Sequence, residues 1–176
     1  MRIQNESADL NVTEEIPKKF QQYRSNHPDL ITKLRNIGIG PAFAVKIIET
    51  FGVDNVVKTI FKDNPYRLMD IEGFGFLRAD AIAVKNLGLS PDDPRRSEAL
   101  ILYVLETNRA FGHVYLPSTI LDRECKKYNV KDFPIRLQEM IKAGKLIIEE
   151  NRIYDAGLYA AEVETACMIL ARVKNI

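Results

Sequence analysis

Long apolar runs are absent from this chain of 176 residues. None approaches the roughly 20 consecutive residues that a helix needs to cross a bilayer. The first residues are polar and lack the apolar centre of a secretory signal peptide. With 46% hydrophobic and 28% charged residues, the chain can form one ordinary domain or two small ones. The sequence therefore predicts a globular protein without a membrane segment.

Metal-binding and nucleophilic residues are also scarce. The two cysteines, Cys125 and Cys167, and the two histidines lack the spacing of a metal site. We interpret the cysteines as reduced thiols and expect a cytoplasmic protein. His113 has no serine, cysteine or carboxylate partner fixed by spacing, so we interpret it as structural. No Gly-x-x-x-x-Gly-Lys-Ser/Thr loop occurs. The sequence predicts no catalytic residue, no metal site and no cofactor for this chain.

A strong net charge is missing as well, since the chain carries only +1. This value argues against a strongly basic nucleic-acid-binding protein. The distribution is uneven, however. Residues 1–16 carry one base and four acids, whereas residues 17–90 carry eleven bases and seven acids. If the chain binds phosphate, we expect residues 17–90 to do so.

Helical periodicity is the main pattern in the sequence. Apolar residues recur at three- and four-residue spacing in segments 27–37, 41–52, 53–62, 65–71, 76–88 and 94–112. Asn64-Pro65 and Asp93-Pro94 are typical of helix starts. Glycines with a left-handed backbone are expected at helix ends, at Gly52, Gly88 and Gly112.

The chain contains an internal repeat with an offset of 35 residues. One matched pattern of glycine, alanine and apolar positions is harder to obtain by chance than a single glycine pair. The offset places Gly38 on Gly73, Gly40 on Gly75, Ala44 on Ala79 and Ile47 on Ile82. The two copies predict tandem helix-hairpin-helix repeats over residues 17–90.

Each copy has a Gly-x-Gly turn between two helices. Glycine allows a tight turn and close approach of another molecule. The first amides of the next helix lack intrahelical partners and favour anions. Each hairpin is therefore a candidate site for a DNA phosphate, without base reading. The predicted contacts are Arg35, Gly38, Ile39, Gly40, Ala42 and Lys46 in the first copy, and Gly73, Phe74, Gly75, Leu77 and Arg78 in the second.

A structural interpretation of the hairpins remains open, in which Gly-x-Gly only lets two helices pack closely. Ile39 and Phe74 are expected in or near the core under either interpretation. The second hairpin is the weaker candidate for phosphate, because Glu72 and Asp80 flank it with negative charge.

After residue 112 the predicted order is helix, strand, helix, helix, strand, strand, counting the helix before it. This order is typical of a winged-helix-like α+β unit, here residues 91–156. Bound DNA would meet Arg136 and Lys142 of helix 133–143 and Arg152 of the strand pair. Because Glu139, Glu149 and Glu150 lie nearby, a packing or connecting role is favoured. Residues 157–176 predict a C-terminal helix with an apolar stripe, and residues 1–16 a flexible leader.

Two segments resemble a known family. "NPYRLMDIEGFGFLRAD" (64–80) and "FGHVYLP" (111–117) are similar to runs upstream of the motor in RecD-like ATP-dependent DNA helicases. The likeness extends from about residue 20 to the end of the chain. It implies a superfamily 1 parent that moves 5′ to 3′ on single-stranded DNA, with ATP and magnesium in motor domains that would be partners in cis. Since the ATP-binding loop is not in this sequence, we expect a fragment or truncated relative that is not itself an enzyme.

Three functions follow from these patterns. The first is a sequence-independent accessory region that holds single-stranded, duplex or forked DNA for a helicase of DNA repair or recombination. The second is a protein-interaction or scaffolding module whose hairpins are only folding devices. The third is an independent junction-binding protein that resembles the tandem-hairpin domain of the branch-migration protein RuvA. The Asn-Pro-Tyr and Gly-His-Val-Tyr-Leu-Pro runs argue against the third.

Overall fold

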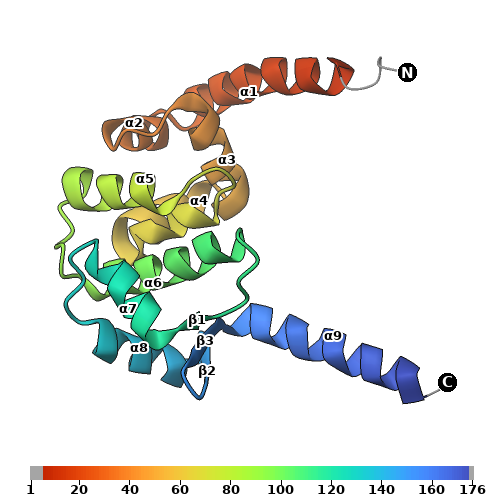
Figure 1. Cartoon of the computed structure of the whole chain (residues 1–176). Coiled ribbons are helices and arrows are strands. Elements are labelled where there is room, and N and C mark those ends of the chain that lie inside the picture. Colours follow the sequence, from red (N-terminus) through yellow and green to blue (C-terminus); the bar gives the residue numbers. More distant parts are fainter. Residues whose placement is uncertain (1–5, 175–176) are drawn as a thin grey trace. The chain divides into compact units, whose positions relative to one another are not determined.

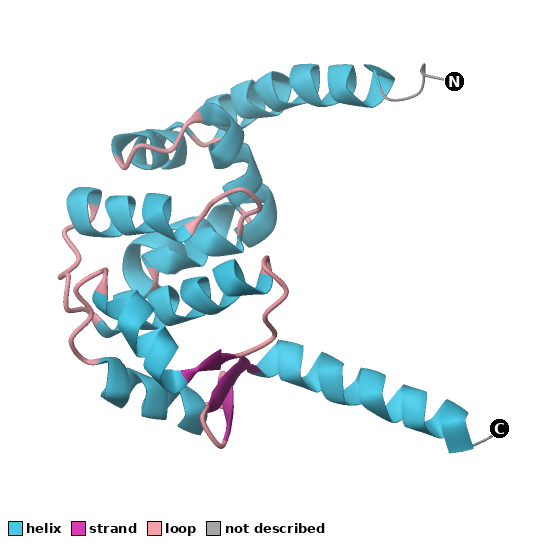
Figure 2. Cartoon of the chain, in the orientation of Figure 1, coloured by secondary structure: helices cyan, strands magenta, loops and turns pink. Residues whose placement is uncertain are grey.

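The chain forms two compact units that divide between Ser90 and Pro91. The computed structural model describes residues 6–174, with the side chains of residues 15–173. We call the two parts the N-terminal unit and the C-terminal unit. Helices make up most of both, as the labelled elements of Figure 1 and the colouring of Figure 2 show. The predicted mainly α fold is therefore confirmed.

The N-terminal unit consists of helical segments joined by short turns. In chain order they are α1 (Glu6–Asn26), α2 (Pro28–Asn36), α3 (Pro41–Phe51), α4 (Val53–Val56), the π-helical η1 (Val57–Asp63), the 3₁₀ helix η2 (Pro65–Asp70), α5 (Phe76–Ala81) and the π-helical η3 (Ile82–Asn86). The helices match the predicted segments, and α5 continues directly into η3.

The predicted flexible leader is the exception in this unit. Its residues 6–16 belong to α1, while residues 1–5 lie outside the described part of the chain. Lys19 explains how this helix is held, because its Nζ lies 2.8 Å from Oε1 of Glu15 and 2.8 Å from Oε1 of Glu49. The first ion pair spans one turn of α1 and the second joins α1 to α3.

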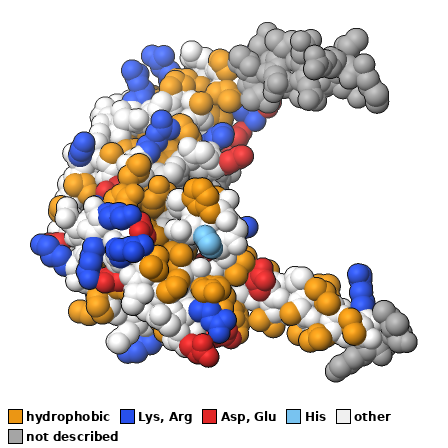
Figure 3. All heavy atoms as spheres, viewed as in Figure 1, with side chains coloured by type: hydrophobic (Ala, Val, Ile, Leu, Met, Phe, Trp, Pro, Cys, Tyr) orange, Lys and Arg blue, Asp and Glu red, His pale blue; other side chains and the backbone are white. Residues whose placement is uncertain are grey.

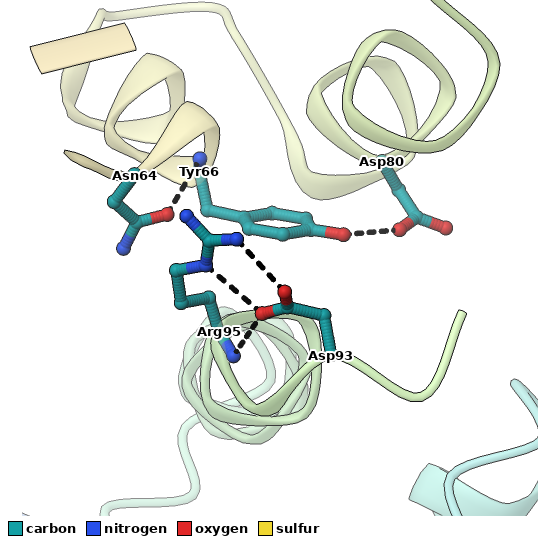
Figure 4. Close-up of polar contacts among 5 residues, drawn as sticks. All are labelled: Asn64, Tyr66, Asp80, Asp93 and Arg95. Carbon is teal, nitrogen blue, oxygen red and sulfur yellow. Dashed lines mark hydrogen bonds and ion pairs between the residues drawn. The ribbon is translucent and has the colours of Figure 1, made fainter. Parts of the chain in front are cut away.

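Two predicted helix starts are present with their caps. The Asn64 side chain accepts a hydrogen bond from the Tyr66 amide at 2.9 Å, at the start of η2. The Asp93 carboxylate accepts from the Arg95 amide at 2.9 Å and from its guanidinium, and these bonds lower the pKa of that carboxyl (Figure 4). In both cases proline occupies the first helical turn, where no amide is needed.

The predicted left-handed glycines are also confirmed. The backbone φ is +77° at Gly52, +71° at Gly88 and +87° at Gly112. Glycine adopts this region without the steric cost that a Cβ would impose.

The core of the N-terminal unit lies between the two repeat copies and η2. Tyr66 of η2 is buried and its ring stacks on Phe76 with centroids 5.9 Å apart. η2 therefore supports the helix that follows the second hairpin. Among the largest fully buried side chains of this unit are Leu34, Ile47, Ile60, Leu68 and Phe76.

The C-terminal unit combines helices with a small sheet. Its elements are α6 (Pro94–Arg109), β1 (Leu116–Pro117), α7 (Ser118–Lys126), α8 (Phe133–Lys142), β2 (Leu146–Glu149), β3 (Arg152–Asp155) and α9 (Ala156–Lys174). The strands form an antiparallel sheet in the order β1-β3-β2, drawn in magenta in Figure 2. The element order is the predicted one, and the winged-helix-like description stays a prediction.

The first strand is shorter than the predicted run "HVYLP". Only Leu116 and Pro117 pair with β3, opposite Ile153 and Arg152. The His113 amide instead donates to the Asn108 carbonyl at 3.2 Å, so the turn that ends α6 uses this part of the run. The residues between Gly112 and Leu116 are consequently irregular in conformation.

The last helix, α9, presents an apolar surface to solvent. Figure 3 shows apolar side chains, in orange, along the helix before its grey end. The exposed large apolar residues of α9 are Val163, Met168, Ile169, Leu170 and Val173. Within residues 6–174, no helix combines the length and the apolar character required to cross a membrane.

Adjacent residues at the start of α5 provide a test of the fold. Phe76 is fully buried, whereas Leu77 is 60% exposed. We expect Phe76→Ala to lower the free energy of unfolding by about 3–5 kcal/mol. Leu77→Ala should change it by no more than about 0.5 kcal/mol. Urea unfolding followed by circular dichroism measures both, and equal losses would show that the burial of this helix is misassigned.

Candidate nucleic-acid interface

The first hairpin joins α2 to α3 through a turn closed by its own backbone. Gly38 has φ +85°, and its amide donates to the Arg35 carbonyl at 2.9 Å. The Ile39 amide donates to the Leu34 carbonyl at 3.0 Å. These two bonds form a Schellman motif, which satisfies the last carbonyls of α2. Gly40 then caps α3 with extended backbone, φ −78° and ψ 168°.

The second hairpin repeats this backbone conformation. Gly73 has φ +79°, and Gly75 caps α5 with φ −77° and ψ 168°. The hydrogen bonds of the turn differ, since the Phe74 amide donates to the Ile71 carbonyl at 2.9 Å and the Gly73 amide, unlike that of Gly38, has no backbone partner among the described residues. The preceding segment is a 3₁₀ helix rather than an α-helix, which accounts for the shorter-range bond. The sequence repeat is thus a repeat of backbone structure.

Several predicted phosphate donors are already used within the chain. The amides of Gly38, Ile39 and Phe74 donate to backbone carbonyls, and Ile39 and Phe74 are both 3% exposed. Their side chains belong to the core, as expected. Of the predicted amide donors that the structure describes, those without a hydrogen-bond partner are Gly40, Ala42, Gly73, Gly75 and Leu77. All five residues are exposed, so each hairpin offers at least two amides to a ligand.

The cationic side chains of the two copies converge. Lys46 of α3 donates from Nζ to the carbonyl of Glu72 at 3.3 Å, in the turn of the second hairpin. The Arg78 guanidinium lies 4.7 Å from the ring centroid of Phe43 and 5.5 Å from that of Phe74. The two rings meet edge to face with centroids 5.0 Å apart. The assignment of Lys46 to the first hairpin alone is therefore incomplete, because its ammonium group lies at the second.

Phe43 is the residue of this site that the sequence interpretation missed. Lys46 also lies near its ring, at 6.0 Å. Phe43 and Arg78 are separated by 35 residues, the offset of the repeat, so they occupy equivalent positions in the two copies. A contact between equivalent positions lies at the junction of the copies. The 35-residue offset aligns Phe43 with Arg78 in the sequence, and this aromatic–cation pair is the signal that indicates the contact.

Comparison with known proteins agrees with this architecture. Residues 24–115, just over half of the chain, match the family described as the ATP-dependent RecD2 DNA helicase HHH domain. The chain belongs to this family. A curated relative, the ATP-dependent RecD2 DNA helicase of Deinococcus radiodurans, is 28% identical over 137 residues. The match covers 76% of this chain and 18% of the relative, so the chain spans less than a fifth of the length of that protein. The expected likeness to RecD-like helicases is confirmed.

The acidic residues beside the second hairpin of this RecD2-type HHH domain differ in their placement. Asp80 is half-buried and its carboxylate accepts a hydrogen bond from the Tyr66 hydroxyl at 2.7 Å, as Figure 4 shows. Glu72 is exposed. Asp80 is therefore engaged by Tyr66, and the Lys46 ammonium group lies close to the Glu72 carbonyl.

Arg35, predicted as a contact of the first hairpin, lies apart from this cluster. It is an exposed residue in the last turn of α2, and its carbonyl closes the Schellman motif. The structure gives its side chain no contact with the Phe43 cluster among the described residues. It remains a predicted contact from the α2 side of the turn.

The predicted DNA contacts of the C-terminal unit are largely neutralised. Arg136 of α8 lies 2.9 Å from Asp132 and also pairs with Glu139, and its side chain is only 18% exposed. Arg152 pairs with Glu150 at 3.2 Å. Lys142 is exposed. The favoured packing role of α8 in the RecD2-type chain is consistent with these ion pairs.

The histidine, cysteine and acidic side chains of the described residues lie in different surroundings. No group of three or more histidine, cysteine or acidic residues there is arranged to hold a metal ion. Burial raises the pKa of the Cys125 thiol to about 12, which keeps it protonated and unreactive. His113 is exposed at the turn after α6.

The two glycines of each hairpin are expected to respond differently to substitution by alanine. Alanine at Gly38 or Gly73 would require positive φ, and we expect each substitution to cost about 1–2 kcal/mol of stability. A Cβ at Gly40 or Gly75 meets no atom within 4 Å and the backbone is extended there. Gly40→Ala and Gly75→Ala should therefore leave the thermal midpoint nearly unchanged. A large loss in either would contradict the described turn geometry.

Proposed function

We propose that the N-terminal unit is a non-catalytic DNA-binding region of a RecD2-type helicase, which holds DNA by its backbone phosphates. The observation that carries the proposal is the pair of matching hairpins, with unpaired amides at Gly40, Ala42, Gly75 and Leu77 and the cations Lys46 and Arg78 gathered at their junction. Backbone amides and cations recognise phosphate oxygens, which are the same for every base sequence.

Binding by this mechanism depends on several weak contacts acting together. Each neutralised phosphate releases counterions, so affinity falls as salt rises. The excess of four positive charges over residues 17–90 supports such a contact, although the whole chain carries only +1. Because Arg78 is held against the Phe43 and Phe74 rings, its guanidinium loses less side-chain freedom on binding than an unconstrained arginine.

The parent activity is part of the same proposal. The name of the matched relative describes an ATP-dependent DNA helicase, and we infer that this chain serves motor domains in cis that would use ATP and magnesium. The chain itself would need no cofactor, and the expected location is the cytoplasm. The DNA held could be single-stranded, duplex or forked, which titration of the three forms distinguishes.

A second candidate function is protein docking through α9. Its exposed residues Val163, Met168, Ile169, Leu170 and Val173 form more apolar surface than a solvated helix needs. Under this hypothesis the hairpins only shape the fold, and DNA binding at low salt would be absent. The independent junction-binding function is less favoured, since the matched family is the RecD2 HHH domain.

The two converging cations provide a direct test. We expect the double variant Lys46→Gln/Arg78→Gln to bind duplex DNA more weakly and with a shallower salt dependence. The slope of log K against log salt concentration should decrease by about 2, one unit per lost phosphate contact. Fluorescence anisotropy at several salt concentrations measures this slope.

Lys58→Gln/Lys62→Gln is the matched control, because both lysines are exposed on η1 and the double change removes the same two charges elsewhere in the unit. An unchanged slope in Lys46→Gln/Arg78→Gln, or an equal change in Lys58→Gln/Lys62→Gln, would argue against phosphate binding at the hairpins.

Substitution of Gly40 and Gly75 by alanine gives an independent test of the amide contacts. Gly40→Ala/Gly75→Ala should fold, since neither Cβ meets an atom within 4 Å. The added methyl groups lie where a phosphate would approach the backbone, so we expect duplex affinity to fall by about tenfold or more. A folded double variant with the affinity of the original chain would exclude close backbone approach, even if the cations contribute.

A further inference from the structure

The turn between α6 and β1 carries two exposed aromatic rings. Phe111 is 77% exposed and Tyr115 is 38% exposed. The positive φ of Gly112 and the bond from the His113 amide to the Asn108 carbonyl fix the backbone between them. Large apolar side chains this exposed, within five residues of a structured turn, are a feature that folding alone does not require.

A hollow of about 400 Å³ opens beside this turn. That volume is within the size range of small-molecule sites. Its lining combines apolar residues with a few polar groups and includes no aspartate or glutamate: Asn108, His113, Tyr115, Leu116, Pro117 and Ile120. We call this feature the Tyr115 hollow. An aromatic ring, apolar side chains and a few polar groups suit a planar, polar-edged ring such as a nucleobase.

One arginine lies near the Tyr115 ring, and another ends the helix before the turn. The Arg152 guanidinium lies 5.7 Å from the centroid of the Tyr115 ring. Arg109, in the last turn of α6, is exposed and offsets the negative end of that helix. Each arginine also has a carboxylate neighbour, Glu150 at 3.2 Å and Glu106 at 3.2 Å. Both ion pairs are on the surface, where such pairs contribute little to stability.

Tyr115 is supported from within the C-terminal unit. Its ring lies 5.4 Å from that of Tyr154, which is buried and in turn 5.2 Å from Tyr159. The Tyr159 hydroxyl donates to Glu149 at 2.5 Å. This row of rings fixes Tyr115 before any ligand binds, which reduces the entropy lost when a base stacks on it.

We propose that the Tyr115 hollow, together with the neighbouring Phe111, binds an unstacked base of single-stranded DNA. Stacking on aromatic rings is tolerant of base identity because every base has a π-face. Duplex DNA cannot use this site, since its bases are stacked within the helix. The site is separate from the hairpins of the N-terminal unit and uses different chemistry: base stacking in place of phosphate binding.

The test uses the whole 176-residue chain and a fluorescein-labelled 15-nucleotide oligothymidine. We expect Phe111→Ala and Tyr115→Ala each to weaken oligothymidine binding by about five- to a hundredfold. Tyr115→Phe should retain affinity because it keeps the ring. Ile148→Ala is the matched control, since Ile148 is 45% exposed on β2 of the same unit. Duplex affinity should be unchanged in all four variants.

A strand of equal length and charge that lacks bases gives the second measurement. The original chain should bind it more weakly than oligothymidine, and Phe111→Ala should remove most of that difference. If Tyr115→Ala fails to fold, Phe111→Ala still tests the proposal, because the exposed Phe111 ring is not part of the core. Unchanged oligothymidine affinity in Phe111→Ala, as expected if the rings dock a protein, would overturn the proposal. Loss of duplex binding in Lys46→Gln/Arg78→Gln tests the hairpins separately.

Discussion

Positive φ at Gly38 and Gly73 is the constraint on which both hairpins depend. At each position the chain leaves one helix and must reverse before the next begins, and only glycine does so without steric cost. The reversal places a second glycine, Gly40 or Gly75, at the N-terminus of the following helix with extended backbone. One backbone conformation therefore ends a helix and exposes the start of another.

The two copies act as one surface because of how they are joined. Phe43 and Phe74 meet edge to face, and Arg78 lies over Phe43. This contact includes both a residue and its equivalent in the other copy, so it fixes the spacing of the two hairpins as well as their cations. Lys46 strengthens the junction by donating to the Glu72 carbonyl. A side chain from one copy thus contacts the turn of the other.

The local structure of this unit could be predicted from the sequence, because its causes are local. The helix start at Asn64 follows from an oxygen acceptor next to a proline, and the repeat follows from glycine spacing. Long-range placement could not be predicted in the same way. That Lys46 reaches the second hairpin depends on how the copies pack.

Side-chain pairing limited prediction elsewhere in the chain. The sequence placed Glu139 near Arg136, and the structure adds that Arg136 pairs with both Asp132 and Glu139 and is only 18% exposed. The predicted leader contains Glu15, whose partner Lys19 also pairs with Glu49 far along the chain. In both cases the charged side chain forms an ion pair in the folded protein.

The two units differ in net charge, and this difference determines which type of DNA contact suits each unit. Residues 17–90 carry a surplus of four positive charges, whereas residues 91–156 carry eleven bases and eleven acids. Counterion release favours nucleic-acid binding only where positive charge is in surplus, so the C-terminal unit has little to gain from it. Stacking on a ring needs no net charge. Phe111 and Tyr115 therefore provide the type of contact that a neutral unit can make, while the hairpins provide the type that a basic unit can make. A chain with both could distinguish an opened strand from a duplex without reading any base.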